Sequence, residues 1–529
     1  MIMLISLASE INSLSHQLDR ISERNRHYRD FTLNSLTFAI REVIACLSVY
    51  RTYANATTGT VSERDQKYIE AAVEEAKKRN PRTARSLFDF IQDTLLLRNL
   101  QHFRDEDRPQ VIDFVMELQQ LTGPVMAKSV EDTAFYVFNQ LTSLNEVGGD
   151  PEQFGLSVEA FHRENANRQH HWRHSMLASS THDTKRSEDV RARINVVSEI
   201  PEEWGAALDR WSRLNADKKS PVGADRAPDA NDEYLFYQTL VGAWPVELSS
   251  AEEFADFRQR MNGYMLKAIK EAKVHTSWVN PNEAYNQAVS KFVEEVLAPG
   301  PENSFLSDFI HFHRRVAYPG MLNSLSQTLL KIASPGVPDF YQGTELWNFS
   351  LVDPDNRRPV DFSKRMTILE ELKQREKEDR ASLIQDLLAC WVDGKIKLYV
   401  THKSLSFRRS HRSLLEDGDY LPIDAPEGSR DHICGFARRK DGAWALVAVP
   451  RLITQLLKPE LPPLTADTWG STALVLPEDA PERWLNTFTG EELQVFSSEG
   501  KKLLHLASVF QTFPLALLTT PNSEDSAGS

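Results

Sequence analysis

A histidine and an aspartate stand side by side in the segment 179–186, which reads Ser-Ser-Thr-His-Asp-Thr-Lys-Arg. The apolar run Met176–Ala178 before it predicts a buried strand that ends in a polar loop. His182 and Asp183 would then lie at the carboxyl end of that strand, where (β/α)8 barrels build their active sites. A carboxylate there can stabilise an oxocarbenium-like transition state, and a neighbouring imidazole can hydrogen-bond sugar hydroxyls.

The same segment also has a plainer interpretation. An isolated His-Asp pair is more often a cap or a surface turn than a catalytic group. The basic residues Lys185 and Arg186 could pair with Glu188 and Asp189 on a solvated helix. The segment by itself therefore leaves both interpretations open.

A second segment, 334–346, also predicts a strand that ends in polar residues. Its polar side chains are Asp339, Tyr341, Gln342 and Glu345. Aromatic and amide side chains at a strand edge suit a sugar ring, which has an apolar face to stack on and hydroxyls to bond. For Glu345, a tight turn set by Gly343 is an equally good explanation. The loop that follows, 351–362, alternates acids and arginines, which predicts either a loop held by ion pairs or a substrate-binding loop.

The elements around these segments are mostly helical in the first three quarters of the chain. Apolar side chains recur at helical spacing, and we expect helices near 4–21, 33–47, 83–98 and 109–122 and over much of 186–300. After Cys390 the pattern changes to short β-prone runs at 397–401, 443–449 and 471–476. Turn signals such as Asp441-Gly442 separate these runs, which predicts a small β domain.

Composition excludes several classes of protein. The 529 residues carry 61 Lys and Arg against 75 Asp and Glu, a net charge of −14. Nucleic-acid binding needs a clustered basic surface, so we expect no nucleic-acid partner. The cysteines Cys46, Cys390 and Cys434 are far apart, which predicts a reducing compartment and neither a disulfide framework nor a zinc site. No run approaches the roughly 18 apolar residues of a membrane span, so we expect a cytoplasmic protein without a membrane partner.

The two polar segments resemble maltooligosyltrehalose synthases, enzymes of the alpha-amylase family. Two segments are similar to that family rather than to amylases in general. Their sequences are STHDTKRSEDVRAR at 180–193 and SPGVPDFYQGTELWNFSLVDPDNRRPVDF at 334–362. Further stretches agree in the same order, among them SEINSLSHQLDRISERNRHYRDFT, KSVEDTAFYVFNQLTSLNEVGGDPEQFG and KVHTSWVNPNEAYNQAV. The resemblance runs from about residue 7 to about residue 518, nearly the whole chain.

The resemblance implies an isomerase that needs no metal or organic cofactor. Such enzymes convert the reducing-end alpha-1,4 linkage of a maltooligosaccharide to alpha,alpha-1,1, with a carboxylate nucleophile and a general acid about 5–5.5 Å apart. Asp183 matches the family's third carboxylate, which supports the transition state, and His182 matches its hydroxyl-binding histidine. The resemblance suggests further pocket residues, namely Lys185, Arg186, Tyr341, Gln342 and Glu345.

The resemblance also implies that the nucleophile and the general acid are absent from this chain. In the family both precede the helical region with which this sequence begins. Asp393-Gly394 distantly resembles the motif of the family's nucleophile, but we interpret it as a turn. The acidic pair Glu131-Asp132 is interpreted as support for the fold or for a binding subsite. We therefore expect a fragment: either a separate chain supplies the N-terminal half, or the gene is split or truncated. The alternative is a catalytically inactive glucan-binding remnant, whereas an unrelated helical scaffold leaves the ordered matches unexplained.

The fold implied by the resemblance is α/β: a partial (β/α)8 barrel (late strands only) with a large helical insertion and a C-terminal β domain. The expected organisation is a mostly helical region with barrel-flanking helices over 1–170, late barrel strands with the insertion over 171–390, the β domain over 395–520 and a disordered tail over 521–529. An unclosed parallel sheet exposes its edges, so we expect poor solubility or partial unfolding of the isolated chain. A maltooligosyltrehalose trehalohydrolase acts next in the family's pathway, which implies a functional association with one.

Overall fold

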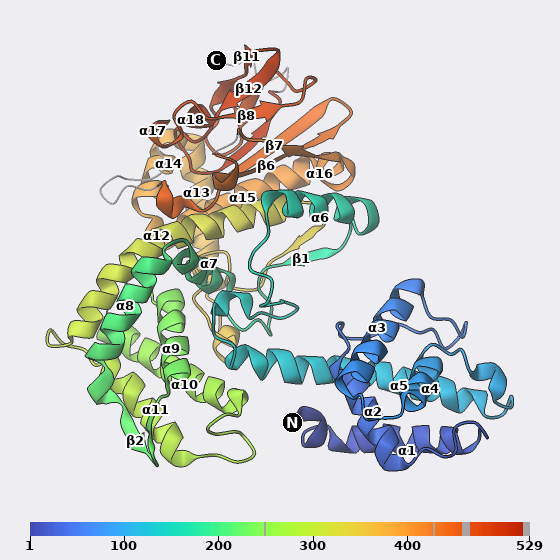
Figure 1. Ribbon diagram of the computed structural model, residues 1–529. Helices are drawn as coiled ribbons and strands as arrows, with labels where there is room; N and C mark the ends of the chain where they lie inside the picture. Colours follow the sequence, from blue (N-terminus) through green and yellow to red (C-terminus); the bar gives the residue numbers. More distant parts are fainter. Residues whose placement is uncertain (248–249, 427–428, 457–465, 522–529) are drawn as a thin grey trace. The chain divides into compact units, whose positions relative to one another are not determined.

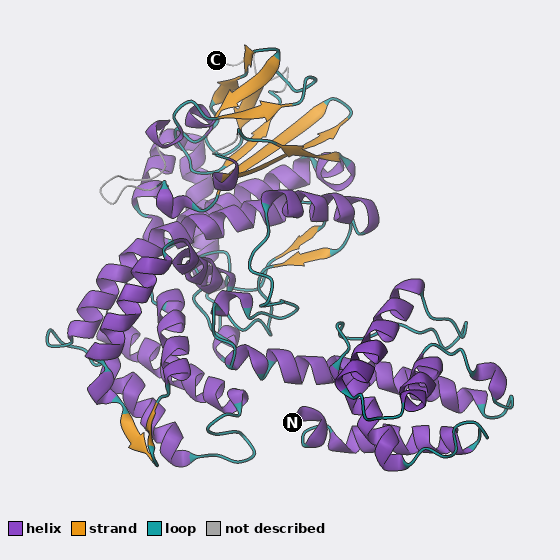
Figure 2. Ribbon diagram, viewed as in Figure 1, coloured by secondary structure: helices purple, strands orange, loops and turns teal. Residues whose placement is uncertain are grey.

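The computed structural model describes residues 1–247, 250–426, 429–456 and 466–521. The chain divides into two compact units, unit 1 over Met1–Val137 and unit 2 over Phe138–Ser529 (Figure 1). Figure 2 shows that the strands of the described residues lie in unit 2. The division falls earlier in the chain than residue 170, where the sequence suggested the first boundary.

Unit 1 packs amphipathic helices around an apolar core. Its long helices are α1 (Ala8–Glu23), α2 (Leu33–Ala45), α3 (Glu63–Arg79), α4 (Arg85–Leu95) and α5 (Arg108–Met126). Its short helical turns are η1 (Ile2–Leu4), η2 (Leu100–His102), η3 (Ala127–Glu131) and η4 (Ala134–Tyr136). Leu14, Leu18 and Ile21 recur at helical spacing on α1 and are buried in this core, which confirms the helix that their periodicity predicted.

The first part of unit 2 is also mainly helical. Its helices are α6 (Val158–His171), α7 (Glu188–Val196), α8 (Pro201–Leu214), α9 (Ala230–Ala243), α10 (Ala251–Ala272), α11 (Glu283–Val296) and α12 (Ser304–Ala333). Its short turns are η5 (Thr142–Leu144), η6 (Val197–Glu199) and η7 (Ala216–Lys218), and a small hairpin pairs β2 (Ser220–Val222) with β3 (Asp225–Ala227). Helix α12 is 30 residues long and its side chains are buried along most of its length.

Two short strands within this helical region form a parallel pair. Strand β1 (Met176–Ala178) pairs with β4 (Val337–Asp339) in the register Met176 to Val337 and Ala178 to Asp339. Both segments were expected to be strands, and the described residues place them in a two-stranded sheet of their own. The expected burial of the run 176–178 is wrong, because Met176 is 68% exposed. The pair unites the two polar segments that the sequence had singled out.

The last part of unit 2 combines helices with antiparallel sheets. The helices are α13 (Phe362–Glu378), α14 (Arg380–Ala389), α15 (Lys395–Ser410), α16 (Arg412–Asp417), α17 (Ala466–Trp469) and α18 (Leu506–Val509), with turns η8 (Asp355–Arg357), η9 (Trp391–Asp393), η10 (Arg430–His432) and η11 (Ile453–Gln455). The strands are β5 (Asp419–Ile423), β6 (Ile433–Lys440), β7 (Ala443–Pro450), β8 (Ala473–Leu476), β9 (Arg483–Asn486), β10 (Glu492–Gln494), β11 (Phe496–Ser498), β12 (Lys501–His505) and β13 (Ala516–Thr519).

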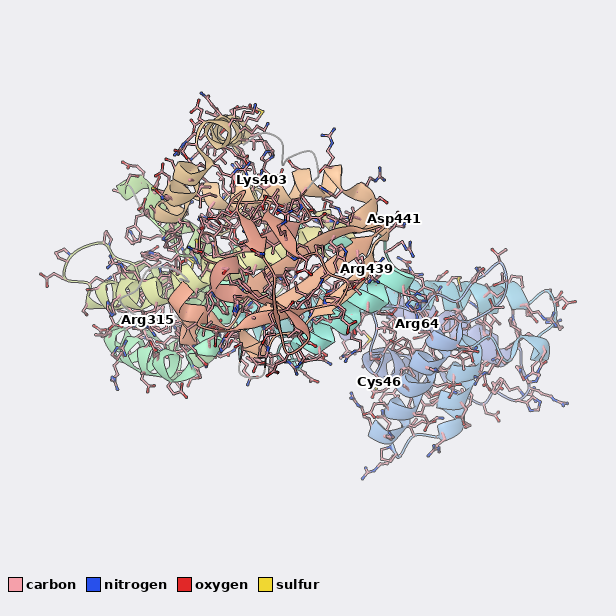
Figure 3. All side chains as sticks on the ribbon, turned by 90° about the horizontal axis from the view of Figure 1, so that it is seen from above. Cys46, Arg64, Arg315, Lys403, Arg439 and Asp441 are labelled. Atoms are coloured by element: carbon pink, nitrogen blue, oxygen red, sulfur yellow. The ribbon has the colours of Figure 1, made fainter. Side chains whose placement is uncertain are left out.

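The described strands form one sheet of order β10-β9-β13-β7-β6-β5 and another of order β11-β12-β8. The expected turn at Asp441-Gly442 is confirmed: both residues have positive φ, 50° and 82°, and they join β6 to β7 (Figure 3, with Arg439 and Asp441 labelled). Leu325 of α12 and Leu446 of β7 belong to one apolar core, so α12 and this sheet share their packing.

One predicted strand is wrong. The run 397–401 was expected to open the β domain, but it lies in helix α15, and the first strand of this region begins at Asp419. The β-prone side chains Ile396, Tyr399 and Val400 are buried on the helix at spacings of three and four residues. Packing against the core therefore overrides their intrinsic preference for strands.

Among the described residues, no helix combines the length and apolar character needed to cross a membrane. The three cysteines, Cys46, Cys390 and Cys434, are free thiols. Of the expected disordered tail, residues 522–529 lie outside the described residues.

Candidate functional site

The carboxyl ends of β1 and β4 meet at one edge of the parallel pair. Ala178 lies opposite Asp339, so the loop that follows β1 and the loop that follows β4 leave the sheet together. The segments are far apart in the sequence, and the pairing of the strands makes them neighbours. The structure therefore brings the two polar segments together.

His182 and Asp183 lie on the loop after β1, and both are exposed. The loop is a tight turn, in which the Thr181 hydroxyl accepts a hydrogen bond from the backbone N–H of Asp183 at 3.2 Å. The carboxylate and the imidazole are thus held outside the core, where a ligand can reach them.

Tyr341 and Gln342 follow β4, and Asn356 connects their loop to the first one. Tyr341 is half-buried and Gln342 is exposed. The Asn356 side-chain amide donates to the backbone carbonyl of His182 at 3.1 Å, and the backbone carbonyl of Asn356 accepts from the Tyr341 hydroxyl at 3.0 Å. The sequence gave no signal for Asn356 beyond its place in the loop 351–362.

Glu345 forms an ion pair with Arg365 at 2.8 Å, and Gly343 has a positive φ of 90°. A Cβ at Gly343 would lie 3.0 Å from the Asn348 amide, so this turn favours glycine. Both features agree with the structural explanation of Glu345, namely a turn held in place.

Lys185 and Arg186 are buried rather than solvated. Their backbone N–H groups donate to the Glu146 carboxylate at 2.7 and 3.2 Å. The Arg186 guanidinium donates to the Tyr264 hydroxyl at 2.7 Å and to the Thr142 carbonyl at 3.2 Å. Arg186 therefore anchors the loop to buried residues of unit 2.

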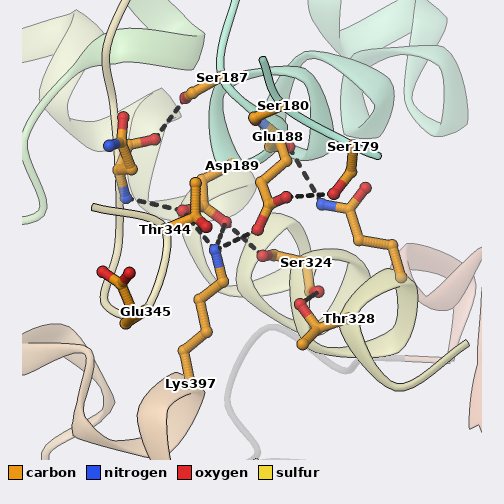
Figure 4. A network of polar contacts seen from close by, with 12 residues as sticks. Ser179, Ser180, Ser187, Glu188, Asp189, Ser324, Thr328, Thr344, Glu345 and Lys397 are labelled. Atoms are coloured by element: carbon orange, nitrogen blue, oxygen red, sulfur yellow. Dashed lines mark hydrogen bonds and ion pairs between the residues drawn. The ribbon is translucent and has the colours of Figure 1, made fainter. Parts of the chain in front are cut away.

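The alternative interpretation, a solvated helix after this loop, is wrong. Glu188 and Asp189, the first residues of α7, are 1% and 2% exposed, and they pair with lysines from other helices. Figure 4 shows Lys397 of α15 with its ammonium group directed at both carboxylates. Its Nζ lies 2.7 Å from Glu188 and 2.9 Å from each carboxylate oxygen of Asp189.

Lys331 of α12 completes this group, which we call the buried tetrad: Glu188, Asp189, Lys331 and Lys397. The Lys331 ammonium lies 3.5 Å from Glu188 and donates to the Ser179 hydroxyl at 2.7 Å. Two carboxylates thus face two ammonium groups. Burial and the neighbouring charge of Glu188 raise the pKa of Asp189, against the attraction of Lys397. Burial opposes ionisation of Glu188, but Lys397 and Lys331 outweigh it and lower the pKa of this carboxyl to about 2.

The loop 351–362 is held by ion pairs to α10. Lys267 binds Asp353 at 2.7 Å, and Arg260 binds Asp355 at 2.7 Å. Arg358 adds a contact to Asp355 at 3.1 Å. The ion-pair interpretation of this loop is confirmed, and the same pairs fix Asn356 between the two site loops.

The two acidic look-alikes lie elsewhere. Asp393-Gly394 forms the turn between η9 and α15, as expected, with Gly394 at a φ of 76°. Glu131 is buried in unit 1 and accepts a short hydrogen bond from the Tyr50 hydroxyl, which agrees with a role in the fold.

Among the described residues, a single group has the spacing of metal ligands. The ligand atoms of Asp229, Asp232 and His275 lie within 4.8 Å of one another. They already bind inside the group, because His275 lies 2.7 Å from Asp229 and the Tyr285 hydroxyl donates to Asp232 at 2.6 Å. These contacts account for the group without an ion. The sequence could not show it because His275, in the loop after α10, lies 46 residues after Asp229 at the start of α9.

Taken together, the edge of the parallel pair offers an accessible carboxylate, an imidazole, a phenol and an amide on loops that are anchored from below. These groups can bind hydroxyls and support a developing positive charge.

Comparison with known proteins identifies related enzymes. The chain is 38% identical over 411 residues to a protein named as a maltooligosyl trehalose synthase of Mycobacterium tuberculosis, a match that covers 77% of this chain and 46% of that one. The solved maltooligosyltrehalose synthase of Arthrobacter ramosus is 31% identical, with a TM-score of 0.71 over 97% of this chain and 56% of the other. A hypothetical maltooligosyl trehalose synthase from Sulfolobus tokodaii gives 27% and 0.63 over 96% and 58%.

No protein-family model matches the chain. The resemblance to maltooligosyltrehalose synthases is confirmed by the homologue and by the solved structures. The chain spans about half the length of the relatives that it matches.

Proposed function

We propose that this chain carries one side of the active site of a maltooligosyltrehalose synthase. Such an isomerase converts the reducing-end alpha-1,4 linkage of a maltooligosaccharide to alpha,alpha-1,1. The observation that carries the proposal is the shared edge of β1 and β4, where His182, Asp183, Tyr341 and Gln342 come together. Homology to named synthases supports the same reaction.

Each side chain has a role in this proposal. Asp183 stabilises the oxocarbenium-like transition state, and His182 binds sugar hydroxyls. Tyr341 and Gln342 contact the sugar ring from the second loop. Arg186, being buried against Thr142 and Tyr264, acts by holding the loop, as does Lys185 through its backbone.

The nucleophile and the general acid then come from residues outside these 529. The chain matches about half of the length of these relatives, so their remaining length has room for both. We propose that β1 and β4 are two strands of a (β/α)8 barrel that this remaining length completes, either on the same polypeptide or as a separate N-terminal half. Met176 and Val337, at 68% and 42% exposure, provide apolar surface that further elements would cover.

This reaction needs no metal or organic cofactor. It requires that water be excluded while the released glucose turns and attacks again, because otherwise hydrolysis results. The product is the substrate of a trehalose-releasing hydrolase, so we propose a functional association with a maltooligosyltrehalose trehalohydrolase. A cytoplasmic location remains a prediction from cysteine usage.

The second candidate function is a glucan-binding remnant without turnover. It is favoured by the same edge, which offers binding groups but a single carboxylate with an assigned catalytic role, that of Asp183. A remnant would bind maltopentaose and would stay inactive in the presence of the complementary half.

The test is turnover of maltopentaose, scored as loss of reducing ends and formation of a non-reducing product. We expect no product from the chain alone and product once the family's N-terminal half is added as a separate polypeptide. Asp183→Asn should abolish this product, whereas the matched control Asp441→Asn, at the exposed β6–β7 turn, should retain it. Failure of the reconstituted enzyme, with maltopentaose still bound, would favour the remnant.

A further inference from the structure

The buried tetrad lies directly beneath the loop that holds His182 and Asp183. Lys397 comes from α15, 209 residues after Glu188, and its side chain is 0% exposed. Its three N–H donors are matched by three carboxylate oxygens, one of Glu188 and two of Asp189. The lysine therefore joins two consecutive residues at the start of α7 to helix α15, which lies 209 residues later in the chain.

Glu188 closes the loop after β1 on itself. Its backbone N–H donates to the Ser180 hydroxyl at 2.9 Å, and its carboxylate accepts a short hydrogen bond from the Ser179 hydroxyl. The first two residues of the loop are thus tied to the residue that follows its end. A contact that orients the Glu188 side chain therefore also orients the loop from Ser180 to Glu188.

Asp189 connects the same point to the loop after β4. Its carboxylate accepts from the backbone N–H of Asn348 at 2.7 Å and from the Ser324 hydroxyl of α12 (Figure 4). The backbone N–H of Ser187 donates to the Ser350 carbonyl at 3.0 Å, close by. Both site loops therefore depend on the orientation of these two carboxylates.

Stability alone is a poor explanation for this arrangement. Apolar side chains of similar volume often stabilise a core as well as or better than buried ion pairs do. Charged groups with many directed hydrogen bonds do fix one arrangement of the chain, because any other leaves a buried charge unpaired.

We propose that Lys397 is a positioning residue, which holds Glu188 and Asp189 and, through them, the segments 179–187 and 343–351. The inference rests on the proposed function only in treating these segments as the substrate loops.

The experiment is hydrogen–deuterium exchange of the full chain without substrate, read by mass spectrometry. Lys397→Met keeps the length of the side chain and removes its charge. Because the variant also loses global stability, exchange should become faster in unit 2 generally. We expect the increase in peptides from 179–189 and 343–351 to be about tenfold larger than in the other peptides of unit 2. Lys403→Met is the matched control, since it lies on the same helix and loses an ion pair to Glu376 on α13.

Faster exchange spread evenly over unit 2, or the same increase in Lys403→Met, would overturn the proposal, because Lys397 would then only stabilise the core. The double variant Lys397→Met/Asp189→Asn provides a second test, since one carboxylate and one ammonium remain in balance. It should fold and still show fast exchange in the two segments. Exchange at the wild-type rate in the double variant would show that only charge balance matters and would contradict positioning.

Activity separates this inference from the proposed function. In the reconstituted enzyme, Lys397→Met should lower product formation from maltopentaose far more than Lys403→Met does. An inactive wild-type enzyme would refute the proposed function, whereas the exchange result would still decide the role of Lys397.

Discussion

The imidazole of His313 makes a clear prediction about stability and pH. It is 4% exposed on α12 and stacks on Phe309, with ring centroids 5.8 Å apart. Within the described residues its Nε2 has no hydrogen-bond partner. Burial, reinforced by the positive charge of Arg193, lowers the pKa of His313 well below 6.5.

The size of the effect follows from proton linkage. The unfolded chain takes up the proton near pH 6.5 and the folded chain does not. The contribution of His313 to the free energy of unfolding is therefore fully present above that pH and is lost as the pH falls below it. Below it, the free energy of unfolding falls by about 1.4 kcal/mol for each pH unit, until the folded imidazole is protonated. Between about pH 7.5 and about pH 5 the loss is roughly 2 kcal/mol. In His313→Gln this contribution is absent.

Urea unfolding at each pH measures the difference. The ten tryptophans all lie in unit 2, so their fluorescence reports the unit that contains His313. The comparison of wild type with His313→Gln removes the pH dependence of all other groups. A difference in unfolding free energy that stays constant from pH 7.5 to 5 would refute the reasoning.

Three further predictions use the same assay. Lys397→Met should lower the free energy of unfolding by about 3–5 kcal/mol because it leaves a buried carboxylate unpaired. The control Lys403→Met should lower it by about 1 kcal/mol or less. Equal losses in the two variants would contradict the burial argument. Gly320→Ala should lower the free energy of unfolding by about 1–3 kcal/mol, because its Cβ would lie 2.9 Å from the Cα of Arg193 on α7. Gly263→Ala has open space around it and should stabilise α10 by up to about 1 kcal/mol. Asp183→Asn should change stability by less than about 0.5 kcal/mol because the side chain is exposed, and a larger loss would assign Asp183 a structural role.

Much of the candidate site could be predicted because its signals are local. An apolar run followed by His182 and Asp183 marks a strand end, and a similar run before Tyr341 marks another. The structure confirms both strands and pairs them in parallel. The role of Asp183 in catalysis stays a prediction.

The supporting residues could not be predicted because their roles depend on distant partners. Nothing near Lys397 in the sequence indicates that it pairs with Glu188 and Asp189, and its β-prone neighbours predicted a strand instead of α15. Asn356 joins two loops through hydrogen bonds to residues that lie 174 and 15 positions before it.

The sequence by itself determined the types of chemical group, the periodicity of most helices, the ends of β1 and β4 and the resemblance to the synthases. These properties depend on side-chain type and on spacing within a few residues. The tertiary structure decided that α15 is a helix, that Glu188 and Asp189 are buried rather than solvated, and that Arg186 anchors the loop from below. The physical reason is that a charge can be buried only where opposite charges and hydrogen-bond donors meet it, and here those groups come from helices more than a hundred residues away.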